Sequence, residues 1–366
     1  SKQGLELAFQ RGFKVEENDL NTLAESPFES LGVSEVCALG EIPESLDKRV
    51  AAMFQRWGIH QIFPVSARKH LEGLIGLGSA MESRPFTSED VSFVRTVGEQ
   101  ALLCLENQRL HLEMVDKERM DRELAIARDI QRRLLPTGPP VITGYDIGAR
   151  AVPCREVGGD YYEFLPYDEG APLGFAIADV SGKSVPASLL MAFAGASTRA
   201  LYVGGQNDPL DLTTALNRIL TESSDENRFM SFFYGTLSIA DGSLRYVNAG
   251  HNPPFVVRKD GSIGRLETGG VVLGLFLDAE FREGRLNLNP GDVLALYTDG
   301  LTEVFDLKER EFGEDRLMET VKSHAHLPCD EILDAVYSEV YRFSQQEHLS
   351  DDATMIIIKR RTIEKE

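Results

Sequence analysis

Five aspartates could do chemistry, because each stands at the end of an apolar, strand-like run and near glycine or serine. Asp160 follows the glycines of "REVGGDYYEFLP", Asp179 closes "LGFAIAD", and Asp299 closes "DVLALYTD". Asp351 and Asp352 precede the run "ATMIIIK". A single such aspartate would be a turn or a helix cap, since an unpaired carboxylate beside an apolar run is costly. Several in one context predict a cluster where the ends of different strands meet.

Clustered carboxylates with no His or Cys nearby in the sequence suit hard cations such as Mg²⁺ or Mn²⁺ rather than zinc. Two such ions about 3.5–4 Å apart would hold a bridging hydroxide and stabilise an in-line displacement at phosphorus. Asp179 could bridge the ions, and the carbonyl of Val180 could add a ligand. The pattern therefore predicts a two-metal hydrolytic site in which water is the nucleophile.

Three other motifs suggest different chemistry. "GGDYYEF" resembles GGDEF, the signature of cyclic-dinucleotide synthases, but Tyr161 and Tyr162 separate the aspartate from the following acid and Phe. "SGKS" is not a P-loop, because Ile177 stands where that motif needs its first glycine. His251 in "NAGHNPP" could be a base or a metal ligand, although a lone His in a Gly/Pro turn is more often structural.

The composition is that of an acidic globular protein of two or three domains. The chain has 366 residues, 42% hydrophobic and 26% charged, with a net charge of −20 and a pI of about 4.8. Nucleic acid and anionic membranes would repel such a chain. The four cysteines form no CxxC pair, which fits a reducing cytoplasm. The N-terminus lacks a signal-peptide pattern and begins abruptly, so we expect a longer parent chain.

From residue 141 onward the pattern predicts one α+β domain in which antiparallel sheets carry helices on their outer faces. The predicted strands are "YDIGARAV", "DYYEFLPY", "LGFAIADV", "FFYGTLSIA", "LRYVNAG", "PFVVRK", "DVLALYTDG" and "TMIIIKRR". The predicted helices span 186–203, 210–224, 313–324 and 330–346.

A long helix is predicted upstream, because neither Pro nor Gly interrupts residues 99–135. Thr87 or Ser88 could cap the helical pattern that leads into it. Leu105, Leu112 and Ile126 share a heptad frame that arginines interrupt, which indicates conditional pairing with a second copy. A solvated spacer is the alternative.

Five ordered motifs carry a family resemblance: "VGGDYYEF", "IADVSGKSVPASLLMA", "NAGHNPP", "GDVLALYTDGLTEV" and "SDDATMIIIK". From about residue 124 to 359 the chain resembles the SpoIIE-type bacterial branch of the PPM (metal-dependent, PP2C-like) serine/threonine protein phosphatases. The resemblance implies a β-sandwich flanked by helices, with a two-metal site at one end. It implies metal binding at Asp160, Asp179, the Val180 carbonyl, Asp299 and Asp351, with Asp352 as second choice, and a catalytic role for Asp160 and Asp179.

The chain departs from the family pattern at three places. Ser184 stands where the branch often has Gly in the segment proposed to switch, and Glu163 stands where Asp is common. The wider family has a His just after the bridging Asp, whereas this chain reads "DVSGK", so the leaving oxygen needs another proton source. Arg155 is the candidate for the arginine that binds substrate phosphate in the wider family.

The N-terminal region resembles the later part of a GAF sensor domain through "GLELAFQRGF", "FPVSARKHLEGLIGLGSA" and "RPFTSEDVSFVRTVGEQALLCLEN". By this resemblance the chain lacks the first helix and strand of the domain. The sequence therefore does not predict an intact ligand pocket. The predicted domains are 1–104 (GAF-like), 105–135 (linker helix or coiled coil) and 136–362 (phosphatase).

These features together predict a cytoplasmic, homodimeric phosphatase with two Mn²⁺ or Mg²⁺ ions, regulated through the sensor and linker by a ligand or protein. By resemblance, its substrate is a phosphorylated STAS-type anti-sigma-factor antagonist. A catalytically inactive regulatory scaffold of the same fold and a nucleotide cyclase are the alternatives.

Overall fold

The computed structural model describes residues 37–38, 48–67, 70–78, 87–154, 157–165, 170–182, 185–223, 228–346 and 348–362. The chain divides into two compact units, residues 1–120 and 121–366. The division falls inside helix α3 (Ser88–Leu134), which contributes to both units. No helix in these ranges is both long and apolar enough to span a membrane.

The first unit contains an antiparallel sheet in the order β1-β2-β3. Its elements are β1 (Cys37–Ala38), α2 (Lys48–Arg56), β2 (Gln61–Ala67), β3 (His70–Leu77) and the beginning of α3. Gly98 lets α3 pack closely on this sheet, because a Cβ there would lie 2.5 Å from Cδ1 of Ile75 and 3.0 Å from Cγ2 of Val65. The GAF-like assignment stays a prediction, and its segment "GLELAFQRGF" lies outside the described residues.

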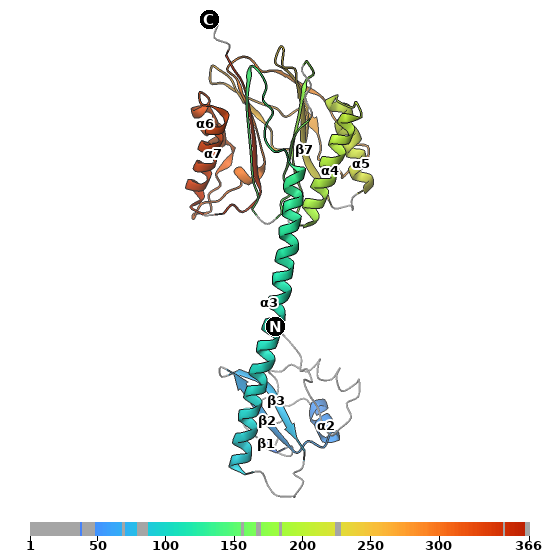
Figure 1. Cartoon of the computed structure of the whole chain (residues 1–366), viewed down its shortest axis with the longest axis vertical. Helices are drawn as coiled ribbons and strands as arrows, with labels where there is room; N and C mark the ends of the chain where they lie inside the picture. The colour runs from blue at the N-terminus through green and yellow to red at the C-terminus, as the bar shows by residue number, and fades with distance from the viewer. Residues whose placement is uncertain are drawn as a thin grey trace. The chain divides into compact units, whose positions relative to one another are not determined.

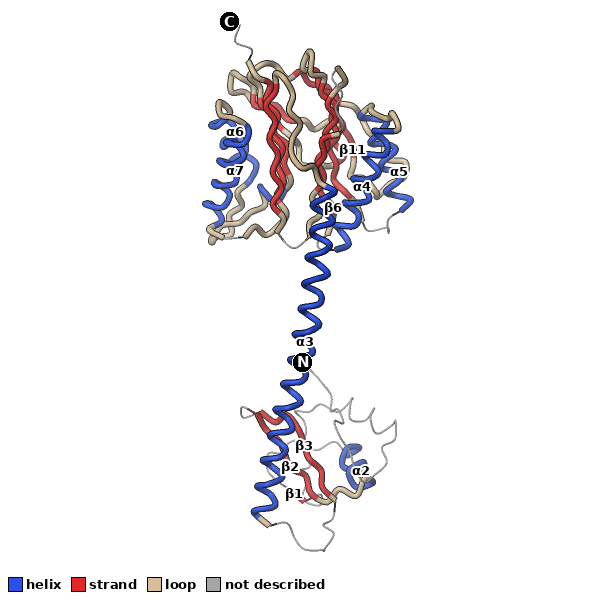
Figure 2. Tube along the Cα trace, in the orientation of Figure 1, coloured by secondary structure: helices blue, strands red, loops and turns tan. Residues whose placement is uncertain are grey.

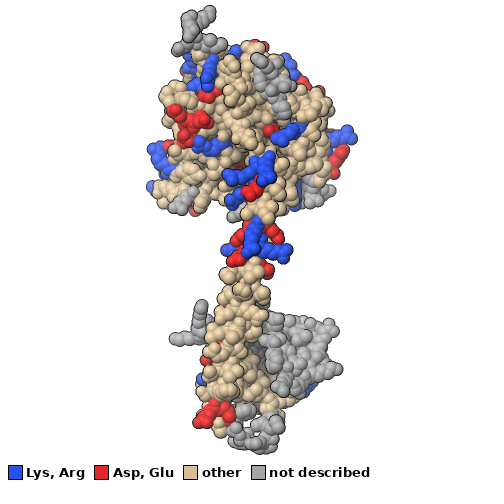
Figure 3. Space-filling view, in the orientation of Figure 1, with Lys and Arg blue, Asp and Glu red and all other residues tan. Residues whose placement is uncertain are grey.

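Helix α3 begins earlier than the predicted linker and passes through Gly98. Thr87 and Asp90 cap it reciprocally, with Asp90 Oδ2 accepting from Thr87 N (2.8 Å) and Thr87 Oγ1 accepting from Asp90 N (3.3 Å). The heptad residues Leu105, Leu112 and Ile126 are 50%, 57% and 61% exposed. The face of α3 seen in Figure 3 has a long uncharged stretch followed by a band of both charges. Its apolar side chains are therefore available for the predicted pairing.

The second unit is a sandwich of two mainly antiparallel sheets (Figure 1). One sheet has the order β10-β9-β13-β14-β4, and the other has the order β11-β8-β7-β6-β5, with β12 beside β8. The strands are β4 (Tyr145–Val152), β5 (Tyr161–Phe164), β6 (Leu173–Val180), β7 (Met230–Leu237), β8 (Ser243–Ala249), β9 (Phe255–Val257), β10 (Ile263–Arg265), β11 (Gly269–Gly270), β12 (Gly284–Asn287), β13 (Val293–Tyr297) and β14 (Ala353–Arg360).

Helices cover both outer faces, with α4 and α5 on one side and α6 and α7 on the other (Figure 2). Their bounds are α4 (Val185–Val203), α5 (Pro209–Ser223), α6 (Gly313–His324) and α7 (Cys329–Ser344). Alternate residues of each strand serve different core layers. Ile177 of β6 lies in the core between the sheets, whereas Ala176 and Ala178 pack under α4 and α5. This arrangement confirms the predicted α+β sandwich.

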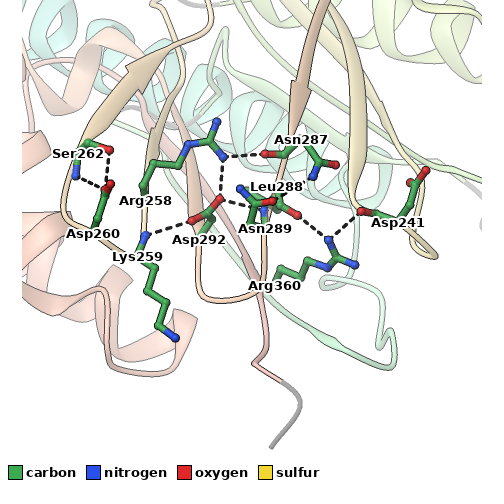
Figure 4. Close-up of polar contacts among 10 residues, drawn as sticks. All are labelled: Asp241, Arg258, Lys259, Asp260, Ser262, Asn287, Leu288, Asn289, Asp292 and Arg360. Carbon is green, nitrogen blue, oxygen red and sulfur yellow. Dashed lines mark hydrogen bonds and ion pairs between the residues drawn. The ribbon is translucent and has the colours of Figure 1, made fainter.

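A polar network ties turns together at one end of the strands (Figure 4). Asp292, just before β13, accepts hydrogen bonds from Arg258 Nη1 (2.7 Å), Lys259 N (3.1 Å) and Asn289 N (2.9 Å). Arg360, at the end of β14, donates to the carbonyls of Asp241 and Leu288, both at 2.8 Å. The carboxylate of Asp292 is therefore occupied by hydrogen bonds within the fold. Asp292 also lies at the opposite end of β13 from Asp299.

Candidate metal centre

The sandwich brings the predicted aspartates together at one end, from strands of both sheets. Asp160 directly precedes β5 and Asp179 lies near the end of β6, and the register Tyr161↔Ala178 makes them neighbours. Asp299 opens a short 3-10 helix, η3 (Asp299–Leu301), after β13, and Asp351 lies before β14. Strands β13 and β14 pair with Tyr297 opposite Met355, so these two acids also lie close.

Three glycines allow this close approach, as shown by what a side chain at each would meet. A Cβ at Gly159 would lie 3.1 Å from the Val180 carbonyl oxygen and 3.4 Å from Asp179 Oδ1. A Cβ at Gly158 would lie 2.5 Å from Asp352 Oδ2, and one at Gly300 would lie 2.0 Å from the Asp352 carbonyl oxygen. The backbone at these positions therefore borders the acid cluster directly.

The cluster is electrostatically strained. Burial, followed by the charges of Asp299, Asp351 and Asp352, raises the pKa of Asp179 to about 7. Burial and the charge of Asp179 hold the pKa of Asp160 well above its usual range. Carboxylates that raise one another's pKa values in this way favour a bound positive charge. An all-oxygen set of carboxylates and one carbonyl fits Mg²⁺ or Mn²⁺.

The acids differ in how far they are buried. Among the residues that the structure describes, no three His, Cys, Asp or Glu side chains form a complete metal-ligand group. Asp179, Asp299 and Asp351 are partly exposed, whereas Asp160 is 8% and Asp352 9% exposed.

Asp352 already has partners within the fold. Its Oδ1 accepts from Cys154 N at 2.8 Å, and its Oδ2 accepts from Gly159 N at 2.6 Å. These bonds fix the ends of the loop that leads to Asp160. The geometry favours Asp352 as the residue that positions this loop and leaves Asp351, which accepts from Asp352 N at 3.0 Å, as the more exposed of the two acids.

Sequence patterns did not reveal two further residues at the centre. Thr298 Oγ1 donates to Asp160 Oδ2 at 2.8 Å and accepts from Thr354 N at 2.9 Å, so it orients the buried acid. Gln131 of α3 forms two hydrogen bonds with the backbone of Gly158, from Nε2 to the carbonyl (2.7 Å) and from Gly158 N to Oε1 (3.1 Å). The adjacency of Thr298 to Asp299 was a usable signal for the first, whereas nothing local marks Gln131.

Of the four other residues that the sequence singled out, two have partners within the fold and two lie outside the described residues. Glu163, at 3% exposure, forms an ion pair with Arg199 of α4 and so joins β5 to that helix. His251 hydrogen-bonds Ser231. Arg155 and Ser184 lie outside the described residues.

Comparisons with known proteins agree with this architecture. The family model described as Stage II sporulation protein E (SpoIIE) matches residues 169–361. Phosphoserine phosphatase RsbU of Bacillus subtilis (strain 168) is 32% identical over 247 residues, which are 67% of this chain and 72% of RsbU. Phosphoserine phosphatase RsbP of the same organism is 27% identical over 242 residues, covering 65% of this chain and 57% of RsbP.

Solved structures show the same fold. The SiaA-PP2C domain of Pseudomonas aeruginosa has a TM-score of 0.58 at 22% identity, covering 67% of this chain and 98% of that domain. The RsbU and RsbW domains of Rv1364c from Mycobacterium tuberculosis give a TM-score of 0.54 at 26% identity, covering 62% of this chain and 63% of that one.

The family model and the two phosphoserine phosphatase relatives define a phosphatase of the PP2C class, a protein serine/threonine phosphatase, and the solved structures share its fold. Within that class, the chain belongs to the SpoIIE family.

Proposed function

We propose that this protein hydrolyses phosphoserine or phosphothreonine on a signalling protein, with divalent cations held by the acid cluster. The observation that carries this proposal is the meeting of Asp160, Asp179, Asp299 and Asp351 at one end of the sandwich. The phosphoserine phosphatase RsbU, a relative across 67% of the chain, supports the reaction type.

Two Mn²⁺ or Mg²⁺ ions would be held by four carboxylates and one backbone carbonyl, from Asp160, Asp179, Asp299, Asp351 and Val180. When bound, such cations supply Lewis acidity, which activates water at neutral pH and neutralises charge on the phosphoryl group. Asp179 is our candidate for the ligand that the two cations would share, because its pKa responds to the charges of Asp299, Asp351 and Asp352.

The protein's own side chains would hold this site in shape. Thr298 fixes the orientation of Asp160, and Asp352 fixes the backbone of Gly159 beside Asp179. Preorganised groups of this kind reduce the rearrangement that the reaction requires. Arg155 remains our candidate for binding the substrate phosphate, and Ser184 our candidate for a switch position.

Regulation would reach the site through α3. Gln131 contacts the loop before Asp160 directly, and the exposed apolar residues of α3 suit pairing with a second copy. We propose that pairing of the linker, controlled by a ligand or protein at the N-terminal region, changes how firmly Gln131 holds that loop.

The substrate that we propose is a phosphorylated STAS-type anti-sigma-factor antagonist. Support comes from the likeness to RsbU and from the Mycobacterium tuberculosis structure, whose name joins RsbU and RsbW domains in one chain. The assay is Mn²⁺-dependent release of phosphate from a panel of phosphorylated STAS proteins and a serine phosphopeptide.

Asp179→Asn is the inactive control for that assay. We expect release by the wild type and a loss of at least about a hundredfold in the variant, since removing one preorganised charge at such a site costs about 3 kcal/mol or more. Binding of Mn²⁺ by the wild type without any release would instead support a catalytically inactive scaffold.

A further inference from the structure

The "NAGHNPP" motif forms a rigid support for one imidazole, at a place that the acid cluster does not use. The Asn248 side chain accepts from His251 N at 2.8 Å and donates to the His251 carbonyl at 3.0 Å. It also donates to the Leu266 carbonyl at 3.0 Å. Gly250 takes a φ of 68°, which makes the turn before His251 possible. The backbone of His251 is thereby fixed on both its donor and its acceptor.

The imidazole has one side-chain partner. His251 is 3% exposed, and its Nδ1 lies 2.8 Å from Ser231 Oγ. Its Nε2 is buried without a hydrogen-bond partner among the described residues. Burial lowers the pKa of His251 to about 4, so the ring is neutral at pH 7. Burying a neutral imidazole costs free energy, and one hydrogen bond to a serine hydroxyl offsets only part of that cost.

The direction of the hydrogen bond between His251 and Ser231 depends on which ring nitrogen carries the proton. With the proton on Nε2, the Nδ1 atom is an acceptor. Ser231 then donates its hydroxyl proton to Nδ1, and its oxygen keeps only lone pairs for other contacts.

Ser231 stands beside the acid cluster. On β7 it is the register partner of Asp179 on β6, and directly opposed residues project on the same face of an antiparallel sheet. Both residues are partly exposed, whereas their neighbours along each strand are buried. An acceptor oxygen beside a cluster of carboxylates is unfavourable unless a cation faces it.

We propose that Ser231 is an additional neutral oxygen ligand of the cation site, and that His251 is its positioning residue. The inference rests on the proposed function, because it presumes a divalent cation at Asp179. It differs from a purely structural role of the motif, which would require no particular group at position 231.

The test measures Mn²⁺ binding to the full chain by titration calorimetry, together with the Mn²⁺-induced shift in melting temperature. We expect Ser231→Ala to weaken Mn²⁺ binding about tenfold, which corresponds to about 1.4 kcal/mol. Ser231→Thr keeps the hydroxyl and should bind within about twofold of the wild type. Ser262→Ala, which removes an exposed hydroxyl in a turn between β9 and β10, should bind as the wild type does.

His251 is tested by a pair of variants. His251→Leu should weaken Mn²⁺ binding as much as Ser231→Ala does, and His251→Asn should restore part of it, because the amide oxygen can accept near the Nδ1 position. If His251→Leu fails to fold, the Ser231→Ala and Ser231→Thr pair still decides the matter.

Two outcomes would overturn the inference: wild-type affinity in Ser231→Ala, or equal weakening in Ser231→Ala and Ser231→Thr. A wild type that neither binds Mn²⁺ nor releases phosphate would instead defeat the proposed function. The two failures are therefore distinguishable.

Discussion

Replacing Gln131 by Ala would test whether α3 controls the metal centre. The side chain forms two hydrogen bonds with the backbone of Gly158, two residues before Asp160. Alanine removes both bonds and retains high helix propensity, so α3 itself should persist. The perturbation is therefore confined to the attachment of the loop.

The expected magnitude follows from the number and kind of bonds lost. A neutral hydrogen bond contributes about 1 kcal/mol net, so the pair contributes about 2 kcal/mol to the ordered loop. If the whole of that free energy is lost from the conformation of the loop that binds the cation, Mn²⁺ binding weakens by up to roughly 30-fold. We expect a loss between about 5-fold and 30-fold, with turnover at saturating Mn²⁺ changed much less.

The assay is Mn²⁺ titration by calorimetry and by phosphate release, with Gln108→Ala as the matched control. Gln108 is an exposed glutamine earlier on the same helix. Equal Mn²⁺ affinity in Gln131→Ala and Gln108→Ala would refute the coupling. A lower melting temperature of Gln131→Ala with unchanged affinity would show that the bonds only stabilise the fold.

Three further predictions concern the acids, the linker and His251. Asp352→Asn should lower the free energy of unfolding by about 2–3 kcal/mol in calorimetry, because it disturbs two charge-assisted bonds to backbone amides, whereas Asp351→Asn should abolish Mn²⁺ binding without that loss. Leu112→Glu combined with Ile126→Glu should lower dimer content in sedimentation and lower phosphatase activity, while the second unit stays folded; unchanged activity would contradict the linker proposal. His251 has a pKa of about 4 in the folded protein and 6.5 in the unfolded chain, so the unfolded chain binds the proton more tightly. The free energy of unfolding therefore decreases as the pH falls from 6.5 to 4. The loss totals about 3 kcal/mol, and in denaturant titrations the difference in stability between wild type and His251→Asn should show this slope; a pH-independent difference would contradict it.

Much of the second unit could be predicted because its long strands and helices carry strong local signals. The helix predicted at 186–203 is α4, and the strand predicted at "LGFAIADV" is β6. Strands β10, β11 and β12 were not predicted, because segments of two to four residues show no usable periodicity. Strand β10 pairs with its chain neighbour β9, whereas β11 and β12 pair with the more distant β8.

The start of the long helix shows the same limit. Thr87 and Asp90 cap α3, as the sequence indicated. The predicted linker nevertheless began at 105, inside what is one continuous helix. In the structure Gly98 is a packing position against Ile75 and Val65, which the local sequence cannot reveal.

The sequence by itself determined which residue types could do the chemistry. The aspartates could be recognised at strand ends, because an uncompensated carboxylate beside an apolar run is costly and therefore informative. It also determined the strand and helix pattern from which the α+β sandwich follows.

Only the tertiary structure decided which groups support those acids. Asp351 and Asp352 are adjacent in the chain, yet Asp351 is partly exposed, whereas Asp352 is buried and binds the amides of Cys154 and Gly159. Gln131 meets Gly158 across 27 residues, and Ser231 meets His251 across 20. Local sequence encodes propensity and burial, whereas hydrogen bonds between distant segments depend on strand register and helix docking, which the whole fold sets at once.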